Sequence, residues 1–252
     1  MKPISLDQPW GRGFNAAHTH TFANDKPPLA TNFLPRGLGR SYGDVCVNDG
    51  ATLLHTFRRD RLLAFDDVQG VLTCEAGASL ADIAQVMLPR GWFLPVVPGT
   101  RYVTVGGAIA NDVHGKNHHI NGTFGRFVKS CSLYRSDWQS AETVAATDAM
   151  FSSVIGGLGL SGLISEASIQ LKPVPGPGIE QETRLFGGDG NIDDYLALDA
   201  QSSAWEYTVG WIDTLDRGLR GVFFRGKHTD GPDQWLAPNA ASLATRSSVS
   251  AV

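Results

Sequence analysis

Glycine most constrains how this chain can fold, because many of its 29 glycines gather in short clusters. The main clusters lie at residues 36–44, 98–107 and 156–162. Glycine lacks a Cβ atom, so it adopts backbone conformations that other residues avoid and leaves the main chain bare. Each cluster therefore marks a tight turn, or a place where a ligand approaches the backbone closely.

The length and charge of the chain narrow the class of protein. At 252 residues it can form one large domain or two modest ones. Hydrophobic residues make up 42% and charged residues 18%, which is typical of a folded globular protein. The formal net charge of −4 argues against a nucleic-acid partner, because nucleic acids bind to basic surfaces.

No membrane or export signal stands out in the sequence. No apolar run is as long as a transmembrane helix, and Met1–Trp10 lacks the apolar core of a signal peptide. Cys46, Cys74 and Cys131 are widely spaced and form no CxxC pair, which favours thiols in a reducing compartment. We therefore expect a cytoplasmic protein without a transmembrane segment, either free or at the periphery of the membrane.

Local patterns predict alternating strands and helices. Ser79 is expected to cap a helix over residues 80–88, which Pro89 would end, and a second helix is predicted from Ala145 to Val154. The first thirty residues are predicted to be an irregular lead-in. Strands are predicted at residues 52–57, 61–65, 70–75, 162–171, 206–213 and 221–225.

The proline- and glycine-rich run Pro173–Gly178 is the clearest linker, and it predicts a domain boundary. The expected organisation is a first domain over residues 1–173 and a partial second domain over residues 174–236. The alanine-, serine- and threonine-rich tail at residues 237–252 is predicted to be disordered.

The loop at residues 36–44 has the composition of a phosphate-binding site. Gly37 and Gly39 stand at alternate positions, so successive backbone N–H groups can point inward and hold an anion. An alternative is a glycine-rich turn with solvated arginines, and the loop alone does not decide between the two. Hydroxyl and guanidinium groups that could bind a diphosphate come from Ser41, Tyr42, Arg36 and Arg40.

Neither glycine motif fits a Rossmann nucleotide site. The first loop has the spacing Gly-x-Gly-x-x-x-Gly, one residue too long, and no amphipathic helix follows it. Residues 157–162 match Gly-x-Gly-x-x-Gly literally, but strand alternation follows at residues 163–171 where a helix is required. The second match is therefore interpreted as a tight loop.

The most specific stretch is residues 98–119, Pro-Gly-Thr-Arg-Tyr-Val-Thr-Val-Gly-Gly-Ala-Ile-Ala-Asn-Asp-Val-His-Gly-Lys-Asn-His-His. Together with the loop at 36–44 and the segment Gly156–Ile164, it resembles flavoproteins with the vanillyl-alcohol-oxidase, or p-cresol methylhydroxylase (PCMH), type of FAD domain. Within that superfamily it is most similar to the decaprenylphosphoryl-β-D-ribose oxidase family. The resemblance is strong over about residues 30–173 and continues weakly to about residue 235.

The resemblance implies an α+β fold, in which a PCMH-type FAD-binding domain of two α/β subdomains precedes the beginning of an antiparallel-sheet substrate (cap) domain. Arg40 stands where some relatives carry the histidine that attaches the flavin, so non-covalent FAD is expected. His114 and Lys116 are the candidate catalytic residues. The residues expected to bind FAD are Arg36, Gly37, Leu38, Gly39, Arg40, Ser41, Tyr42, Gly99, Thr104, Val105, Gly106, Gly107, Asn111, Asp112, Val113, His114 and Ile164.

A metal site is an alternative for the same stretch, because His114 and His118 are four residues apart and Asp112 and His119 lie close by. Gly115 weakens any helix between the two histidines, and no glutamate follows His114 as the HExxH zinc motif requires. No metal is therefore predicted.

The activity implied by the resemblance is hydride removal from an alcohol carbon to the flavin, while a base takes the hydroxyl proton. The substrate would be a sugar secondary alcohol, such as a polyprenyl-phosphate pentose, and a separate NADH-dependent reductase would reduce the keto product. One alternative is an alditol or aldonolactone oxidase of the same superfamily. The other is a non-catalytic FAD-binding fragment, because the family's chains are longer and this one looks truncated.

Overall fold

The computed structural model describes residues 8–10, 19–22, 33–138, 140–188, 192–215, 217–231 and 234–236. The chain divides into two compact units. The first comprises residues up to Gly115 together with Asn121–Pro173, and the second comprises Lys116–Ile120 together with residues from Val174 onward. The predicted tail at 237–252 lies outside the described residues.

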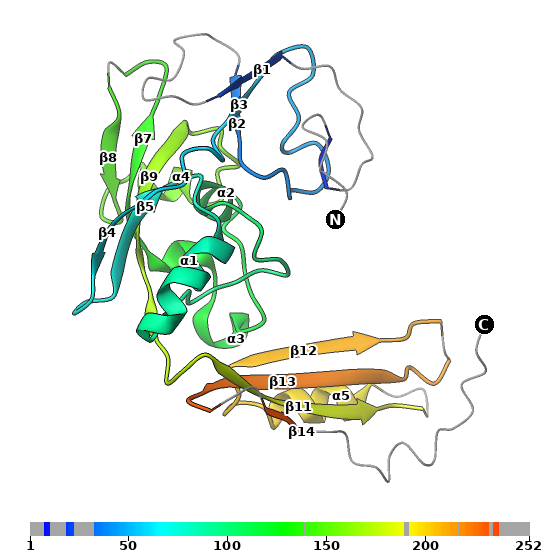
Figure 1. The fold of residues 1–252 in the computed structure, drawn as a ribbon. Helices are drawn as coiled ribbons and strands as arrows, with labels where there is room; N and C mark the ends of the chain where they lie inside the picture. The colour runs from blue at the N-terminus through cyan, green and yellow to red at the C-terminus, as the bar shows by residue number, and fades with distance from the viewer. Residues whose placement is uncertain are drawn as a thin grey trace. The chain divides into compact units, whose positions relative to one another are not determined.

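A five-stranded antiparallel sheet is the framework of the first unit (Figure 1). Alternate side chains of its central strands point into the main hydrophobic core, including Leu72, Cys74, Leu133 and Ile169. In spatial order the strands are β4 (Leu62–Asp66), β5 (Val71–Glu75), β9 (Leu163–Gln170), β7 (Val128–Tyr134) and β8 (Glu142–Ala145).

Two helices pack against this sheet and share its core. Helix α1 (Leu80–Met87) begins at Ser79, whose hydroxyl accepts a hydrogen bond from the backbone N–H of Asp82, as the sequence predicts. Its Leu80, Ile83 and Met87 are buried. Helix α2 (Val105–Ala110) was not predicted, because two glycines make its helix propensity poor.

A small parallel sheet forms the other part of the first unit. Its order is β1 (Thr19–Phe22), β3 (Thr52–His55), β2 (Phe33–Arg36). Leu54 of β3 is buried with Tyr134 and Leu163, which lie at the ends of two strands of the larger sheet. The prediction that the first thirty residues are irregular is wrong at β1. This strand pairs with β3, which is distant in sequence, and local sequence patterns do not reveal such a pairing.

The predicted helix from Ala145 to Val154 is largely wrong. Residues Glu142–Ala145 pair with β7 as strand β8, and only Phe151–Val154 forms a short helix, α4. Asp148 turns the chain between them, because its carboxylate accepts a hydrogen bond from the backbone N–H of Ala145 (2.8 Å). Strand pairing across the sheet thus overrides a weak helical pattern.

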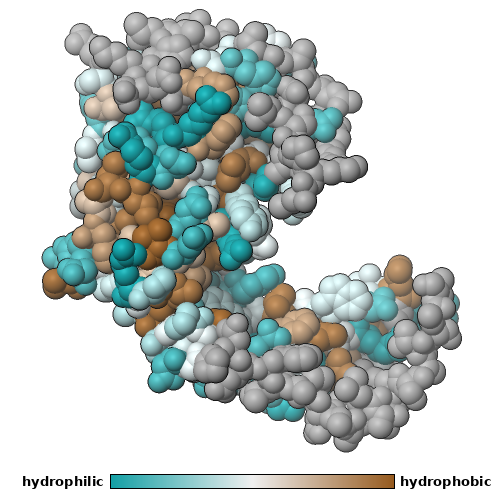
Figure 2. Space-filling view, in the orientation of Figure 1, coloured by the Kyte–Doolittle hydropathy of each residue, from teal (hydrophilic) through white to brown (hydrophobic). Residues whose placement is uncertain are grey.

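Smaller elements complete the first unit. Strands β6 (Trp92–Phe93) and β10 (Lys172–Pro173) pair with each other in antiparallel fashion. Two 3₁₀ turns lie at Leu88–Arg90 and Phe124–Phe127. On the face drawn in Figure 2, hydrophobic side chains gather over the middle of this unit, and they reach the β4–β5 turn, where Val68 is exposed.

A four-stranded sheet forms the second unit, in the order β12 (Tyr207–Ile212), β13 (Gly221–Thr229), β11 (Gly178–Phe186), β14 (Gln234–Leu236). Only the β11–β14 pair is parallel. Tyr195 of helix α5 (Asp193–Ala200) packs on Phe186 and Phe223 of the sheet. The predicted strand over residues 221–225 is present and continues to Thr229. In the part of the chain that is described, no helix has the length and hydropathy needed to span a bilayer.

Candidate cofactor-binding site

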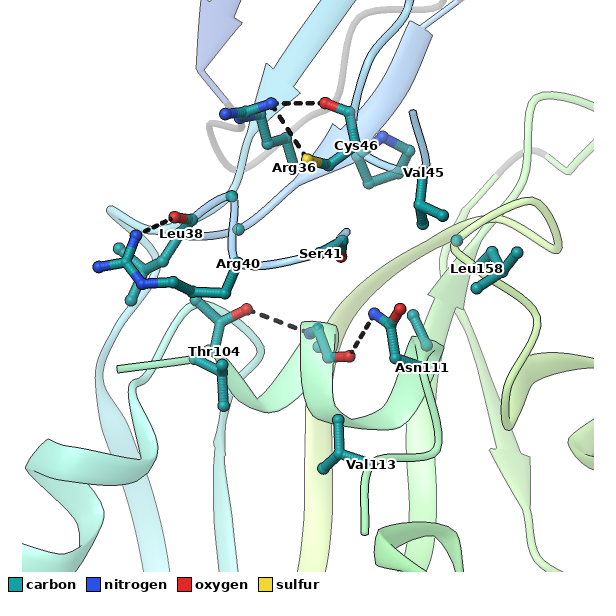
Figure 3. A pocket seen from close by; sticks show the side chains of 18 of the residues that line it. Arg36, Leu38, Arg40, Ser41, Val45, Cys46, Thr104, Asn111, Val113 and Leu158 are labelled. Atoms are coloured by element: carbon teal, nitrogen blue, oxygen red, sulfur yellow. Dashed lines mark hydrogen bonds between the residues drawn. The ribbon is translucent and has the colours of Figure 1, made fainter. Parts of the chain in front are cut away.

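A cavity of about 420 Å³ lies in the first unit and is within the size range of small-molecule sites. Its walls come from segments that are far apart in sequence. They are the turn after β2, the stretch that leads into and out of α2, the turn before β9, and Trp10. Figure 3 shows the first three of these walls.

Arg36, at the end of β2, lies inside the glycine-rich loop and is only 3% exposed. Its guanidinium donates hydrogen bonds to the carbonyl oxygens of Cys46 (2.5 Å) and Gln8 (2.6 Å). In Figure 3 it lies beside Cys46 on one side of the loop, while Thr104 and Asn111 lie on the other. These hydrogen bonds hold the loop together, and Arg36 also lines the cavity, so its contact with a diphosphate stays a prediction.

Gly39 shows why this loop needs glycine. Its φ of +63° lies in the left-handed region, and a Cβ atom at this position would come within 2.5 Å of Nη2 of Arg36. A Cβ atom at Gly37 would likewise overlap the side chain of Thr104, since it would lie well inside van der Waals contact with Oγ1. The loop is thus packed between an arginine and a threonine.

Arg40 supplies a cation at the cavity wall. Its guanidinium donates to the carbonyl oxygen of Leu38 (2.9 Å) and lies over the indole of Trp10, 5.7 Å from the ring centroid. Partial burial lowers the pKa of Arg40 from its ordinary value, but an arginine stays protonated at neutral pH. Ser41 and the exposed Tyr42 line the same wall and offer hydroxyl groups.

The wall around α2 presents bare backbone. Thr104 caps the helix, since its hydroxyl accepts from the N–H of Gly107 (3.1 Å). The amide of Asn111 donates to the carbonyl oxygen of Gly107 (2.9 Å), which fixes the side chain at the cavity edge. The N–H of Gly106 donates to the carbonyl oxygen of Ala76 (2.8 Å), which anchors α2 on the loop after β5.

Most residues expected to bind FAD line this one cavity, but Val105, Asp112 and His114 do not. Val105 is fully buried in the core, and the carboxylate of Asp112 accepts from the N–H of Gly125 (2.8 Å). The expected residues that line the cavity are Arg36, Gly37, Leu38, Gly39, Arg40, Ser41, Tyr42, Gly99, Thr104, Gly106, Gly107, Asn111, Val113 and Ile164.

The two candidate catalytic residues follow α2 in sequence and do not line the cavity. His114 is exposed and forms an isolated β-bridge with Thr123. Lys116 begins the segment that belongs to the second unit, and its carbonyl oxygen accepts from the N–H of Thr208 (2.9 Å). Helix α3 (His118–Asn121) starts only at His118, so His114 and His118 do not share a helix face.

Several lining residues were missed from the sequence. Trp10 and Thr56 lie in segments that carry no glycine motif, while Leu158 and Gly159 belong to the cluster interpreted only as a tight loop. Cys46, to which the sequence assigned no role at the site, reaches the wall because the turn after the loop folds back. Burial is the main cause that raises the pKa of Cys46, so the thiol stays protonated at neutral pH. Local sequence carries no signal for these long-range approaches.

The residues of this cavity fit FAD. A long dinucleotide needs bare backbone along its length, and glycines supply it on two walls of the cavity. At Gly99, no protein atom lies within 4 Å of where a Cβ atom would be, so this part of the wall is open to a ligand. The loop adds a cation and hydroxyl groups for a diphosphate, and the apolar side chains Val103, Val113 and Ile164 suit an aromatic ring system.

Residues 22–137 match a family described as the FAD binding domain. The match spans the glycine-rich loop and all of α2. The match indicates a PCMH-type FAD-binding domain over these residues, with FAD as its cofactor.

The chain is also similar to individual proteins. It is 36% identical over 192 residues to decaprenylphosphoryl-β-D-ribose oxidase of Mycolicibacterium smegmatis. The aligned region covers 73% of this chain and 40% of that protein. It is 43% identical over 157 residues to an uncharacterized protein in the mprA 5′ region of Streptomyces coelicolor, covering 60% of this chain and 41% of the relative. A D-lactate dehydrogenase of Anaerostipes hadrus is 26% identical over 139 residues, covering 53% of this chain and 29% of the enzyme.

The relatives that are named by their activity are thus oxidoreductases. The chain spans about two fifths of the length of the first two relatives.

Proposed function

We propose that this chain acts as an FAD-dependent oxidoreductase that oxidises a secondary alcohol of a sugar to a ketone, the sugar resembling decaprenylphosphoryl-ribose. The observation that carries the proposal is the 36% identity to decaprenylphosphoryl-β-D-ribose oxidase over 73% of the chain. The glycine-lined cavity falls within the part of the chain that matches FAD-binding domains, apart from Trp10 and the wall before β9.

Bound FAD supplies the hydride acceptor for such an oxidation. The chain's own part is to bind the cofactor along the loop and α2, and to present the alcohol to it. We assign His114 and Lys116 to the substrate side. The neutral imidazole of His114 can accept the hydroxyl proton at a ring nitrogen, and the ammonium group of Lys116 can hold a phosphate oxygen.

The finer architecture and partners are part of the same proposal. Residues 1–173 would be the FAD-binding domain, with the three-stranded and five-stranded sheets as the centres of its two subdomains. Residues 174–236 would begin the antiparallel substrate domain. A polyprenyl-phosphate sugar would bring the protein to the membrane surface, and an NADH-dependent reductase would take up the keto product.

The test is anaerobic reduction of the bound flavin. The protein is purified, loaded with FAD and mixed with a ribose phosphodiester carrying a prenyl chain, an alditol, or D-lactate, while the flavin absorbance is followed. Bleaching by the prenylated ribose alone is the expected result. Bleaching by the alditol or D-lactate instead would assign a different substrate, and a stable yellow flavin with every alcohol would indicate a non-catalytic FAD-binding protein.

A matched variant separates binding from chemistry. His114→Gln keeps a polar side chain but removes the base, so we expect FAD to bind with unchanged affinity while bleaching slows at least about 100-fold. Equal bleaching rates in the wild type and the variant would contradict the role of His114.

A further inference from the structure

The short segment Gln8–Trp10 lies against the glycine-rich loop, although more than 25 residues separate the two in sequence. The backbone N–H of Trp10 donates to the carbonyl oxygen of Ser41 (3.3 Å). The carbonyl oxygen of Gln8 accepts from Nη2 of the buried Arg36 (2.6 Å). Pro9, between them, is buried. The segment is therefore fixed at both of its ends to residues of the loop.

Trp10 lines the FAD cavity. It is 50% exposed, so core packing does not account for its position. The guanidinium of Arg40 lies 5.7 Å from the centroid of its ring, within the range of a cation–π contact, which orients the indole at the cavity wall. A large aromatic face that is held in place and left half open can receive a flat ligand.

We propose that Trp10 is a cofactor-contacting residue, whose indole forms one wall of the FAD site. Arg36 and Arg40 then act as positioning residues, which hold the Gln8–Trp10 segment against the loop. FAD carries two aromatic ring systems, and contact between an aromatic side chain and a nucleotide ring contributes markedly to affinity. The inference depends on FAD binding and not on the proposed alcohol oxidation.

Footprinting of the wild-type protein tests the contact without a mutation. Tryptophan oxidation by hydroxyl radicals is measured by mass spectrometry on the apo protein and at saturating FAD. We expect oxidation of Trp10 to fall at least about threefold with FAD. Trp211 is the internal control, because it is 60% exposed, belongs to the second unit and does not line the cavity, so its oxidation should stay the same. Equal oxidation of Trp10 in both states would overturn the proposal.

Titration with FAD tests how much Trp10 contributes to FAD affinity. Trp10→Ala is expected to raise the dissociation constant for FAD by about tenfold, the magnitude expected for one lost aromatic–nucleotide contact. Trp10→Phe keeps an aromatic face and should recover most of the affinity, while Trp211→Ala should bind like the wild type. Thermal unfolding of each apo variant confirms that the fold is intact before the titration.

The results separate this inference from the proposed function. Wild-type protein that binds FAD but is not bleached by any alcohol contradicts the oxidation and leaves Trp10 as a cofactor contact. A Trp10→Ala variant that binds FAD within twofold of the wild type overturns the contact, whatever the substrate.

Discussion

Arg36 shows that a charged residue of a cofactor loop can also stabilise the loop itself. Its charge and its place beside two glycines suggest a diphosphate contact, yet its hydrogen bonds go to the carbonyl oxygens of Cys46 and Gln8. A buried guanidinium must find several acceptors, because leaving its N–H groups without partners would be costly. Arg40, a few residues later, remains at the cavity wall, where its guanidinium donates a hydrogen bond to the carbonyl oxygen of Leu38.

Gly39→Ala is predicted to damage the loop more than Gly43→Ala. Both glycines have left-handed backbones, with φ of +63° and +61°, so alanine should cost each about 1 kcal/mol. Only at position 39 would the new Cβ also meet Arg36, whereas nothing lies within 4 Å of it at position 43. We expect Gly39→Ala to lower the free energy of unfolding by about 2–3 kcal/mol and to weaken FAD binding at least tenfold, measured by urea unfolding and FAD titration.

Gly43→Ala serves as the control for backbone strain alone. If the two variants lose equal stability and equal FAD affinity, the close approach of Arg36 to Gly39 is not what requires glycine there.

At the scale of elements, hydroxyl caps start the two helices that pack on the central sheet. Ser79 caps α1 away from the cavity, and Thr104 caps α2 at the cavity wall. The sequence predicted α1 because a cap, an apolar stripe and a terminal proline agree. It did not predict α2, whose two glycines disfavour a helix; hydrogen bonds from Val105 and Gly106 to Ala78 and Ala76 fix its first turn.

Thr104→Val is predicted to lose both stability and cofactor affinity. The substitution keeps the shape of the side chain but removes the hydroxyl that accepts from Gly107, which should cost about 1 kcal/mol of unfolding free energy. FAD affinity should fall severalfold, because the backbone of α2 forms part of the cavity. Ser79→Ala removes an equivalent cap and should lose similar stability with unchanged FAD affinity. A Thr104→Val variant that binds FAD like Ser79→Ala would contradict this.

A buried carboxylate joins strand β5 to the segment that precedes β4. Glu75, at the end of β5, accepts from the backbone N–H (3.0 Å) and Nη2 (2.9 Å) of Arg61, and pairs with Arg59 at 3.4 Å. Hydrogen bonds from Arg61 are the largest cause that holds the pKa of Glu75 below its ordinary value. The pKa is lower in the folded than in the unfolded protein, so this stability is present above the unfolded pKa of about 4.3 and is lost as pH falls through the folded pKa.

Glu75→Gln should therefore make the free energy of unfolding depend less on pH at acidic pH. At pH 7 the variant is expected to be less stable by about 2 kcal/mol, and the difference should shrink as pH falls below about 4.5. Urea unfolding between pH 3 and pH 7 measures both effects. Glu142→Gln, which changes an exposed glutamate on β8, is the control and should follow the wild type; a Glu75→Gln difference that is constant with pH would contradict the ion-pair explanation.

At the scale of the whole molecule, every residue that lines the FAD cavity belongs to the first unit. The second unit has its own ion pairs. Arg225 of β13 pairs with Glu182 of β11 (2.7 Å) and lies over Trp205, and both side chains of the pair are little exposed. Lys227 lies over the same indole but is nearly half exposed and is 3.4 Å from Glu180.

Arg225→Ala is predicted to weaken the second unit without changing FAD binding. Breaking a largely buried ion pair should cost that unit about 3 kcal/mol, whereas Lys227→Ala, which breaks an exposed pair, should cost less than about 1 kcal/mol. Calorimetry measures the unfolding, and titration should give FAD dissociation constants within twofold of the wild type for both variants. A large loss of FAD affinity in Arg225→Ala would show that the cavity depends on the second unit.

The sequence by itself determined the local features: the glycine-rich loop that cannot be a Rossmann site, the capped helix α1, the strands around it, and a set of residues typical of FAD-binding domains. These follow from backbone freedom, capping and side-chain alternation, which act between near neighbours in the chain. Tertiary structure alone decided that Arg36 turns into the loop, that residues 142–145 pair as a strand, and that Trp10 reaches the cavity. Each of these depends on a partner distant in sequence, because burial and hydrogen bonding are satisfied in space and not along the chain.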